Sequence, residues 1–147
     1  MLSLRACLTA VHLIGLALGV GCATGKLALL VKCRTDRAFV PVYMATARPL
    51  TRFIILGLAL LTLSGVGWLI MGYPLTPRLV VKLVLVGAIW VLGPIIDNVV
   101  EPKFQKLAPA LGAPASTAFL RAQSRYLLLE MAATGLFYII ILMWVLG

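Results

Sequence analysis

The sequence predicts an all-α protein: a bundle of four transmembrane helices that forms a single integral membrane domain over residues 1–147. The chain is 63% hydrophobic and only 12% charged, with a mean hydropathy of +1.11. Such a composition leaves too little polar surface to cover a water-soluble globule. Four apolar runs are each about long enough to cross a hydrocarbon core of roughly 30 Å, and they cover residues 8–31, 53–72, 79–96 and 126–146.

The distribution of basic residues predicts the orientation. The net charge is +9, but the Lys and Arg residues flank apolar spans, so membrane topology explains them and we expect no nucleic-acid binding. The two long connections hold Lys32, Arg34, Arg37, Arg48, Arg52, Lys103, Lys106, Arg121 and Arg125. The other side holds Arg5 and Arg78, with Lys82 just inside the third span. The positive-inside rule therefore places both termini outside and both long connections in the cytoplasm, and we expect a bacterial cytoplasmic (inner) membrane.

The first run is predicted to be a helix that stays in the membrane. It has the basic start of a secretion signal and a small residue before Cys22, but the apolar run continues to Val31 where a cleaved signal would end. Two pairs of glycines spaced by four residues, Gly15 with Gly19 and Gly21 with Gly25, favour close packing against protein. The partner of such a face is another helix of this chain, a second copy or another membrane protein.

The remaining elements follow from prolines and helix caps. We expect a polar connection over residues 33–48, with Pro41 breaking any continuous helix and Pro49 starting the second span. Thr76 should cap the third helix, with Pro77 as its first residue. Gly93 and Pro94 should kink that helix near its cytoplasmic end. Asp97 and Glu101 are expected to be solvated at the interface, and the fourth helix should begin near Thr117.

Four ionisable residues fall inside the spans, where each costs roughly 2.5–3.5 kcal/mol on insertion scales: His12, Lys26, Lys82 and Glu130. His12 and Lys82 lie in the outer half and the other two in the inner half. Lys26 and Glu130 have opposite charges at similar depth, so they are candidates for a structural ion pair. The alternative is that each side chain reaches separately to the cytoplasmic interface.

His12 is a candidate metal or haem ligand, because a neutral imidazole binds iron, copper or zinc. Lys82 and Trp68 could complete a cofactor pocket at the same depth, with a cation for a propionate and an aromatic wall. The alternative is a packing role, in which His12 is hydrogen-bonded to Trp68, Thr9 or a free carbonyl and holds nothing. No serine–histidine–acid arrangement, phosphate loop or zinc cluster is present in the sequence, so no catalytic residue is predicted.

Three cysteines, Cys7, Cys22 and Cys33, leave at least one thiol unpaired within a monomer, and we interpret them as small packing residues.

The segments AVHLIG in the first span, RFIILGLALLTLSGVGWLI in the second and RLVVKLVLV in the third resemble small four-helix bacterial membrane proteins. These are the copper-resistance D domain family and the membrane protoporphyrinogen oxidases. The resemblance covers about the first hundred residues. It implies that His12 and Lys82 match the family's functional histidine and lysine, and that the cofactor is a b-type haem.

Three functions remain open at this point. The protein binds haem or a metal near His12 in the outer leaflet, or it is a non-catalytic accessory or assembly subunit of a membrane complex, or it is a small transporter component. Polar residues at two depths support transport, although the sequence contains no continuous series of acids and bases through the bilayer.

Overall fold

A computed structural model describes residues 3–110 and 113–146, and over these ranges the chain is helical without strands. Four helices are long and apolar enough to cross a membrane, which confirms the all-α four-helix bundle of an integral membrane protein. The elements in chain order are α1 (Leu4–Thr35), the short 3-10 helix η1 (Arg37–Phe39), α2 (Val40–Ile70), α3 (Pro77–Ile95), the π-helical turn η2 (Ile96–Val100), α4 (Glu101–Lys106) and α5 (Thr117–Val145).

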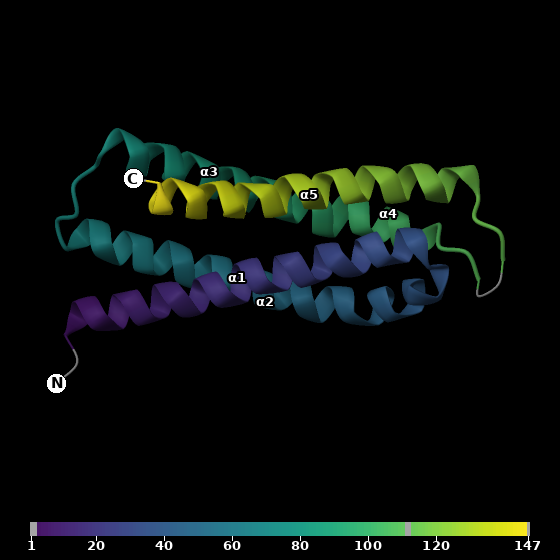
Figure 1. Cartoon of the computed structure of the whole chain (residues 1–147), viewed down its shortest axis with the longest axis horizontal. Helices are drawn as coiled ribbons and strands as arrows, with labels where there is room; N and C mark the ends of the chain where they lie inside the picture. The colour runs from purple at the N-terminus through teal and green to yellow at the C-terminus, as the bar shows by residue number, and fades with distance from the viewer. Residues whose placement is uncertain (1–2, 111–112, 147) are drawn as a thin grey trace.

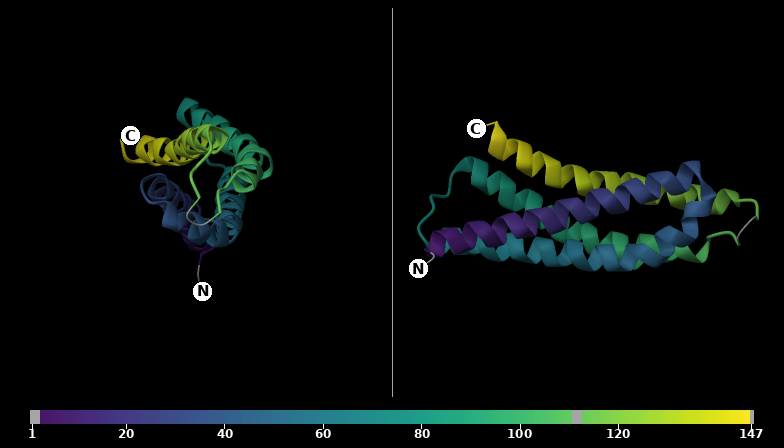
Figure 2. Two further views of the ribbon diagram at one scale, coloured as in Figure 1. Left: turned by 90° about the vertical axis from the view of Figure 1, so that its right-hand side faces the viewer. Right: turned by 60° about the horizontal axis from the view of Figure 1, so that its bottom comes forward.

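The helices form two layers (Figure 1). One layer contains α1 and α2, and the other contains α5 together with the continuous rod of α3, η2 and α4. The two ends of the chain lie at one end of the bundle, and the α1–α2 and α4–α5 connections lie at the other. The end-on view in Figure 2 shows the four rods around a common axis. An even number of crossings therefore brings both termini to the same side, as the charge distribution predicts.

Two helix starts follow the expected capping chemistry. The Thr76 side chain accepts a hydrogen bond from the backbone N–H of Leu79 at 3.2 Å, and Pro77 is the first residue of α3. The fourth long helix begins at Thr117, and Ser116 caps it through the N–H of Phe119 at 3.1 Å. Both expectations from the sequence are confirmed.

The expected polar connection over residues 33–48 is wrong, because α1 continues to Thr35 and α2 already begins at Val40. Pro41 does not break the helix, since it lies in the first turn, where its missing N–H has no intrahelical partner to lose. Pro49 lies inside α2 and does not start it. At 32 residues α1 is about 48 Å long, so it extends beyond a hydrocarbon core of roughly 30 Å.

A π-helical turn over Ile96–Val100 follows Pro94. Pro94 has no N–H to donate, and its own carbonyl accepts from the Asn98 amide at 2.9 Å. A π turn adds one residue to the helical ladder and so rotates the following residues by about 100° around the axis. The expectation that Asp97 and Glu101 are solvated is therefore wrong: Asp97 is half-buried and Glu101 is only 4% exposed.

The α1–α2 contact depends on glycine. A methyl group in place of a hydrogen of Gly57 would lie 2.7 Å from the carbonyl oxygen of Gly15, and it would also collide with the backbone of Gly19. The Gly15–Gly19 pair therefore packs on α2 as expected for small residues. Gly21 and Gly25 differ, because an added methyl group there would meet nothing within 4 Å. This second pair does not pack against the described part of the chain.

Two apolar clusters form the core. The larger lies at the end with the connections and includes Leu30, Tyr43, Phe104, Phe119 and Tyr126. The smaller lies nearer the middle and consists of Ala23, Leu58, Ile89 and Phe137. Beyond it, toward the termini, α3 and α5 diverge from α1 and α2 in both views (Figures 1 and 2). The interior is thus most tightly packed at the end that carries the basic connections.

Candidate functional site

Lys26 lies at the centre of the most polar part of the interior. It is 1% exposed, and its ammonium is within ion-pair distance of three carboxylates: Asp97 at 3.0 Å, Glu101 at 3.0 Å and Glu130 at 2.9 Å. The ammonium also donates to the hydroxyl of Thr51 at 2.9 Å. These residues come from α1, α2, η2, α4 and α5. One cation therefore connects all four membrane-spanning rods, and the candidate pair Lys26–Glu130 is part of a larger set that we name the Lys26 cluster.

The three carboxylates are not equivalent. One ammonium has three N–H groups and cannot donate to four acceptors at once. Its contacts with Thr51 and Asp97 have hydrogen-bond geometry. Oε1 of Glu130 lies close to the ammonium but accepts no hydrogen bond from any described residue. Oε1 of Glu130 is thus a buried carboxylate oxygen of the cluster that accepts no hydrogen bond with good geometry.

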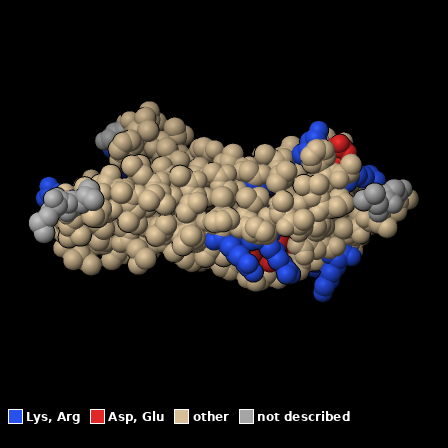
Figure 3. Space-filling model, turned by 90° about the horizontal axis from the view of Figure 1, so that it is seen from below, with Lys and Arg blue, Asp and Glu red and all other residues tan. Residues whose placement is uncertain are grey.

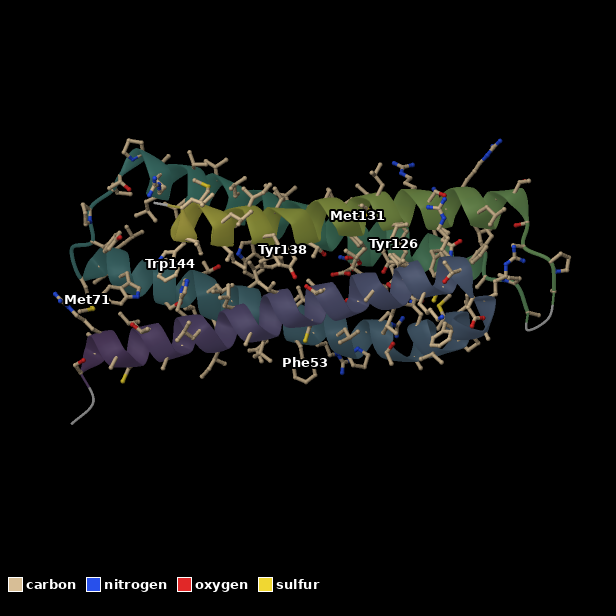
Figure 4. All side chains as sticks on the ribbon, in the orientation of Figure 1. Phe53, Met71, Tyr126, Met131, Tyr138 and Trp144 are labelled. Carbon is tan, nitrogen blue, oxygen red and sulfur yellow. The ribbon has the colours of Figure 1, made fainter. Side chains whose placement is uncertain are left out.

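Glu101, in contrast, is well supplied with donors. The Tyr126 hydroxyl donates to its Oε2 at 2.7 Å, and the Gln105 amide donates to its Oε1 at 3.0 Å. Because the Tyr126 proton is used there, Tyr43 donates its own hydroxyl proton to the Tyr126 oxygen. Both tyrosines are fully buried, and Figure 4 shows Tyr126 between α5 and α1.

The formal charge of the Lys26 cluster is negative, since three carboxylates surround one ammonium. Among the described residues, no other Lys, Arg or His nitrogen lies within 4.0 Å of these acids. Burying unbalanced charge is costly, and a carboxylate relieves that cost by taking up a proton. A cluster of three acids and one ammonium can therefore take up a proton on one of its acids.

A polar stripe on α5 runs through this acid. Gln123, Glu130 and Thr134 are spaced by seven and four residues, so they lie on one face of the helix, and all three are buried. The Gln123 amide nitrogen and the Thr134 hydroxyl have no hydrogen-bond partner among the described residues. One turn beyond Thr134, Phe137 and its apolar cluster end the polar interior.

A cavity of about 190 Å³ adjoins the Lys26 cluster. Its walls include Arg48, Thr51, Arg52, Asp97, Glu101 and Gln105. Both arginines are exposed, so the cavity joins the buried acids to the surface. On the face seen in Figure 3, Lys and Arg side chains flank acidic atoms in the half of the molecule that carries the connections.

In the outer half of the bundle, His12 has a different hydrogen-bond partner from those expected. Nδ1 of His12 lies 2.8 Å from the hydroxyl oxygen of Ser64. That hydroxyl donates to the Leu60 carbonyl at 2.7 Å, so its oxygen accepts from His12 Nδ1–H. The other ring nitrogen, Nε2, is then left as an acceptor.

The other residues considered with His12 have contacts of their own. Trp68 packs edge-on against Tyr73, and Thr9 donates to the carbonyl of Arg5. Within residues 3–110 and 113–146, Lys82 and Trp68 form no hydrogen bond with His12. The described His, Cys, Asp and Glu side chains form no group of three able to hold a metal ion, and all three cysteines are free.

Sequence reasoning missed most of the Lys26 cluster. It placed Lys26 and Glu130 at one depth, but it assigned Asp97 and Glu101 to solvent and did not consider Thr51 or Tyr126. The spacing of the two acids by four residues indicates that they share a helix face, but it does not show that this face points inward.

Comparisons with protein-family models, with curated proteins and with solved structures found no match to this chain.

Proposed function

We propose that this protein is a small proton-coupled transporter component of a bacterial cytoplasmic membrane. The observation that carries the proposal is the Lys26 cluster, in which three acids share one buried ammonium. Ionisable groups at membrane depth are costly and mark ion and proton pathways. A purely structural pair would need only one acid, whereas the additional acids give the site the capacity to bind and release protons.

The proton enters through the cavity beside Arg48 and Arg52, on the side that the basic connections predict to be the cytoplasm. It is transferred to Glu130, whose Oε1 lies 2.9 Å from the Lys26 ammonium without hydrogen-bond geometry. Protonation of Glu130 weakens its attraction to the ammonium and leaves Lys26 paired with Asp97 and Glu101. The contact between α1 and α5 is the one that changes.

Transfer to the other side requires the cluster of Ala23, Leu58, Ile89 and Phe137 to open, because an apolar layer carries no proton. Past this layer the His12–Ser64 pair offers the next acceptor, Nε2 of the imidazole. Opening on one side and closing on the other is the behaviour that alternating access demands.

The deciding test is whether the membrane-embedded protein binds a proton on Glu130. Infrared difference spectra of the reconstituted protein across a pH titration should contain a protonated-carboxyl band that is lost in Glu130→Gln. Asp36→Asn is the matched control, because Asp36 caps a short surface helix and should leave the band unchanged. If no such band appears in the wild type, proton coupling is rejected and the accessory-subunit hypothesis takes its place.

The solute is found with the same preparation. Proteoliposomes that contain a pH-sensitive dye are given small solutes one at a time, and a transported solute changes the internal pH in the wild type but not in Glu130→Gln.

A second candidate function is haem or metal binding in the outer half, and the hydrogen bonds of His12 favour it. Metal-ligating histidines donate one ring N–H to a fixed acceptor and coordinate through the other nitrogen, which is the arrangement that Ser64 imposes here. The residues present would supply one axial ligand. Absorption in the Soret region that disappears in His12→Ala, with the protein still folded, supports this function, whereas a colourless wild type that takes up neither haem nor copper leaves His12 as a packing residue.

A further inference from the structure

The cavity beside the Lys26 cluster separates two kinds of charge. Arg48 and Arg52 are spaced by four residues on α2, so they lie on one face of that helix. Asp97 and Glu101 are likewise spaced by four residues in η2 and α4. Neither arginine forms an ion pair within 4.0 Å with a described carboxylate, although both line the same 190 Å³ cavity as the acids. Space for a ligand remains between the two sets of charges.

One acidic atom is free to meet such a ligand. The contacts of Asp97 with Lys26 and Thr51 all use Oδ1. Both oxygens of Glu101 are engaged, by Gln105 on one side and by Tyr126 and Lys26 on the other. Oδ2 of the half-buried Asp97 is therefore the acceptor left for a cation in the cavity.

The arginines define the anionic end of the ligand. A guanidinium binds a carboxylate through two parallel hydrogen bonds, so one arginine is enough for that group. Two arginines one turn apart suit an anion with more than two oxygens, such as a phosphate ester. A compound with phosphate at one end and a primary ammonium at the other matches both walls.

We infer that the cavity binds a phosphoethanolamine group, with its phosphate at Arg48 and Arg52 and its ammonium at Asp97. The group has two sources: free phosphoethanolamine, or the headgroup of phosphatidylethanolamine in the surrounding bilayer. The inference concerns binding alone and does not depend on proton coupling.

The test uses the full chain in detergent for the free compound and in nanodiscs for the lipid. Isothermal titration with phosphoethanolamine should give one saturable site per chain. Glycerol phosphate, which keeps the phosphate and lacks the ammonium, should bind at least about tenfold more weakly, since a charge-assisted hydrogen bond contributes about 1.5–3 kcal/mol. Equal binding of the two compounds would overturn the zwitterionic assignment.

Arg48→Gln and Arg52→Gln should each weaken binding at least about tenfold. Arg121→Gln and Arg125→Gln, which alter exposed arginines of α5, are matched controls and should change it less than about twofold.

In nanodiscs, native mass spectrometry should find phosphatidylethanolamine retained over phosphatidylglycerol in the wild type and not in Arg48→Gln. Retention of the lipid without binding of the free compound assigns the lipid headgroup as the source, and the reverse result assigns the soluble compound. Binding of neither, or equal binding by the arginine variants, would overturn the inference.

Discussion

The ammonium of Lys26 lies 2.9 Å from Oε1 of Glu130, which joins the first long helix of the chain to the last. The two residues are far apart in sequence, and the contact forms only when the whole bundle has assembled. Removing the cation leaves three acids, two of them buried, without their shared partner, whereas removing one acid leaves the cation with two others. The two substitutions should therefore have unequal effects.

We expect Lys26→Met to lower the free energy of unfolding by about 3–5 kcal/mol, because it strands buried charges. Glu130→Gln should cost less, and the double variant should cost less than the sum by about 0.5–3 kcal/mol. The measurement is unfolding in mixed detergent micelles, followed by tryptophan fluorescence. Lys32→Met, an exposed change on the same helix, is the control. Simple additivity would mean that Lys26 and Glu130 do not interact.

Replacing Tyr126 by phenylalanine should destabilise the protein more than replacing Tyr43. Tyr126→Phe removes a donor to a carboxylate and should cost about 1.5–3 kcal/mol, while Tyr43→Phe removes a donor to a neutral hydroxyl and should cost about 0.5–1.5 kcal/mol. The same unfolding assay compares them. A larger loss for Tyr43→Phe would show that the donor order along the two hydroxyls is the reverse.

Gly57→Ala should destabilise the bundle by about 1–3 kcal/mol, because the added methyl group meets the backbone of α1 and the two helices must separate. Gly65→Ala on the same helix has open space and should be neutral or stabilising by up to about 1 kcal/mol. Thermal unfolding of the two variants in one detergent makes the comparison. Equal losses would mean that α1 and α2 are not in backbone contact.

Reporter fusions test the orientation. Fusions near residues 42 and 110 should report cytoplasm, and a fusion at residue 147 should report the outer side, because basic residues concentrate in the two long connections. A cytoplasmic C-terminus would reverse the side from which the cavity beside Arg48 and Arg52 is reached.

The four-helix architecture was predictable because hydropathy over about 20 residues dominates the choice of membrane spans. The start of α2 was not, because Pro41 is compatible both with a loop and with a first helical turn, and only the packing of Tyr43 and Ala47 in the core decides between them.

The Lys26–Glu130 pair was accessible because counting residues from the span ends gives depth. The inward position of Asp97 and Glu101 was not predictable. The π turn after Pro94 rotates these residues around the helix axis, and a proline in the sequence does not specify that rotation. The Ser64 partner of His12 was not predicted, because the sequence alone does not show which residue of the second span faces His12.

The divergence of the helices beyond Phe137 makes the molecule mechanically asymmetric. Ile89 is the only buried residue of α3, and Phe137 is the last buried residue of α5. Between these residues and the termini, the described parts of α3 and α5 therefore bury no side chain against the other layer. Packing of buried side chains between the two layers therefore does not fix the spacing of the rod tips. The spacing of these tips should consequently follow the thickness and curvature of one leaflet, while the opposite end stays rigid.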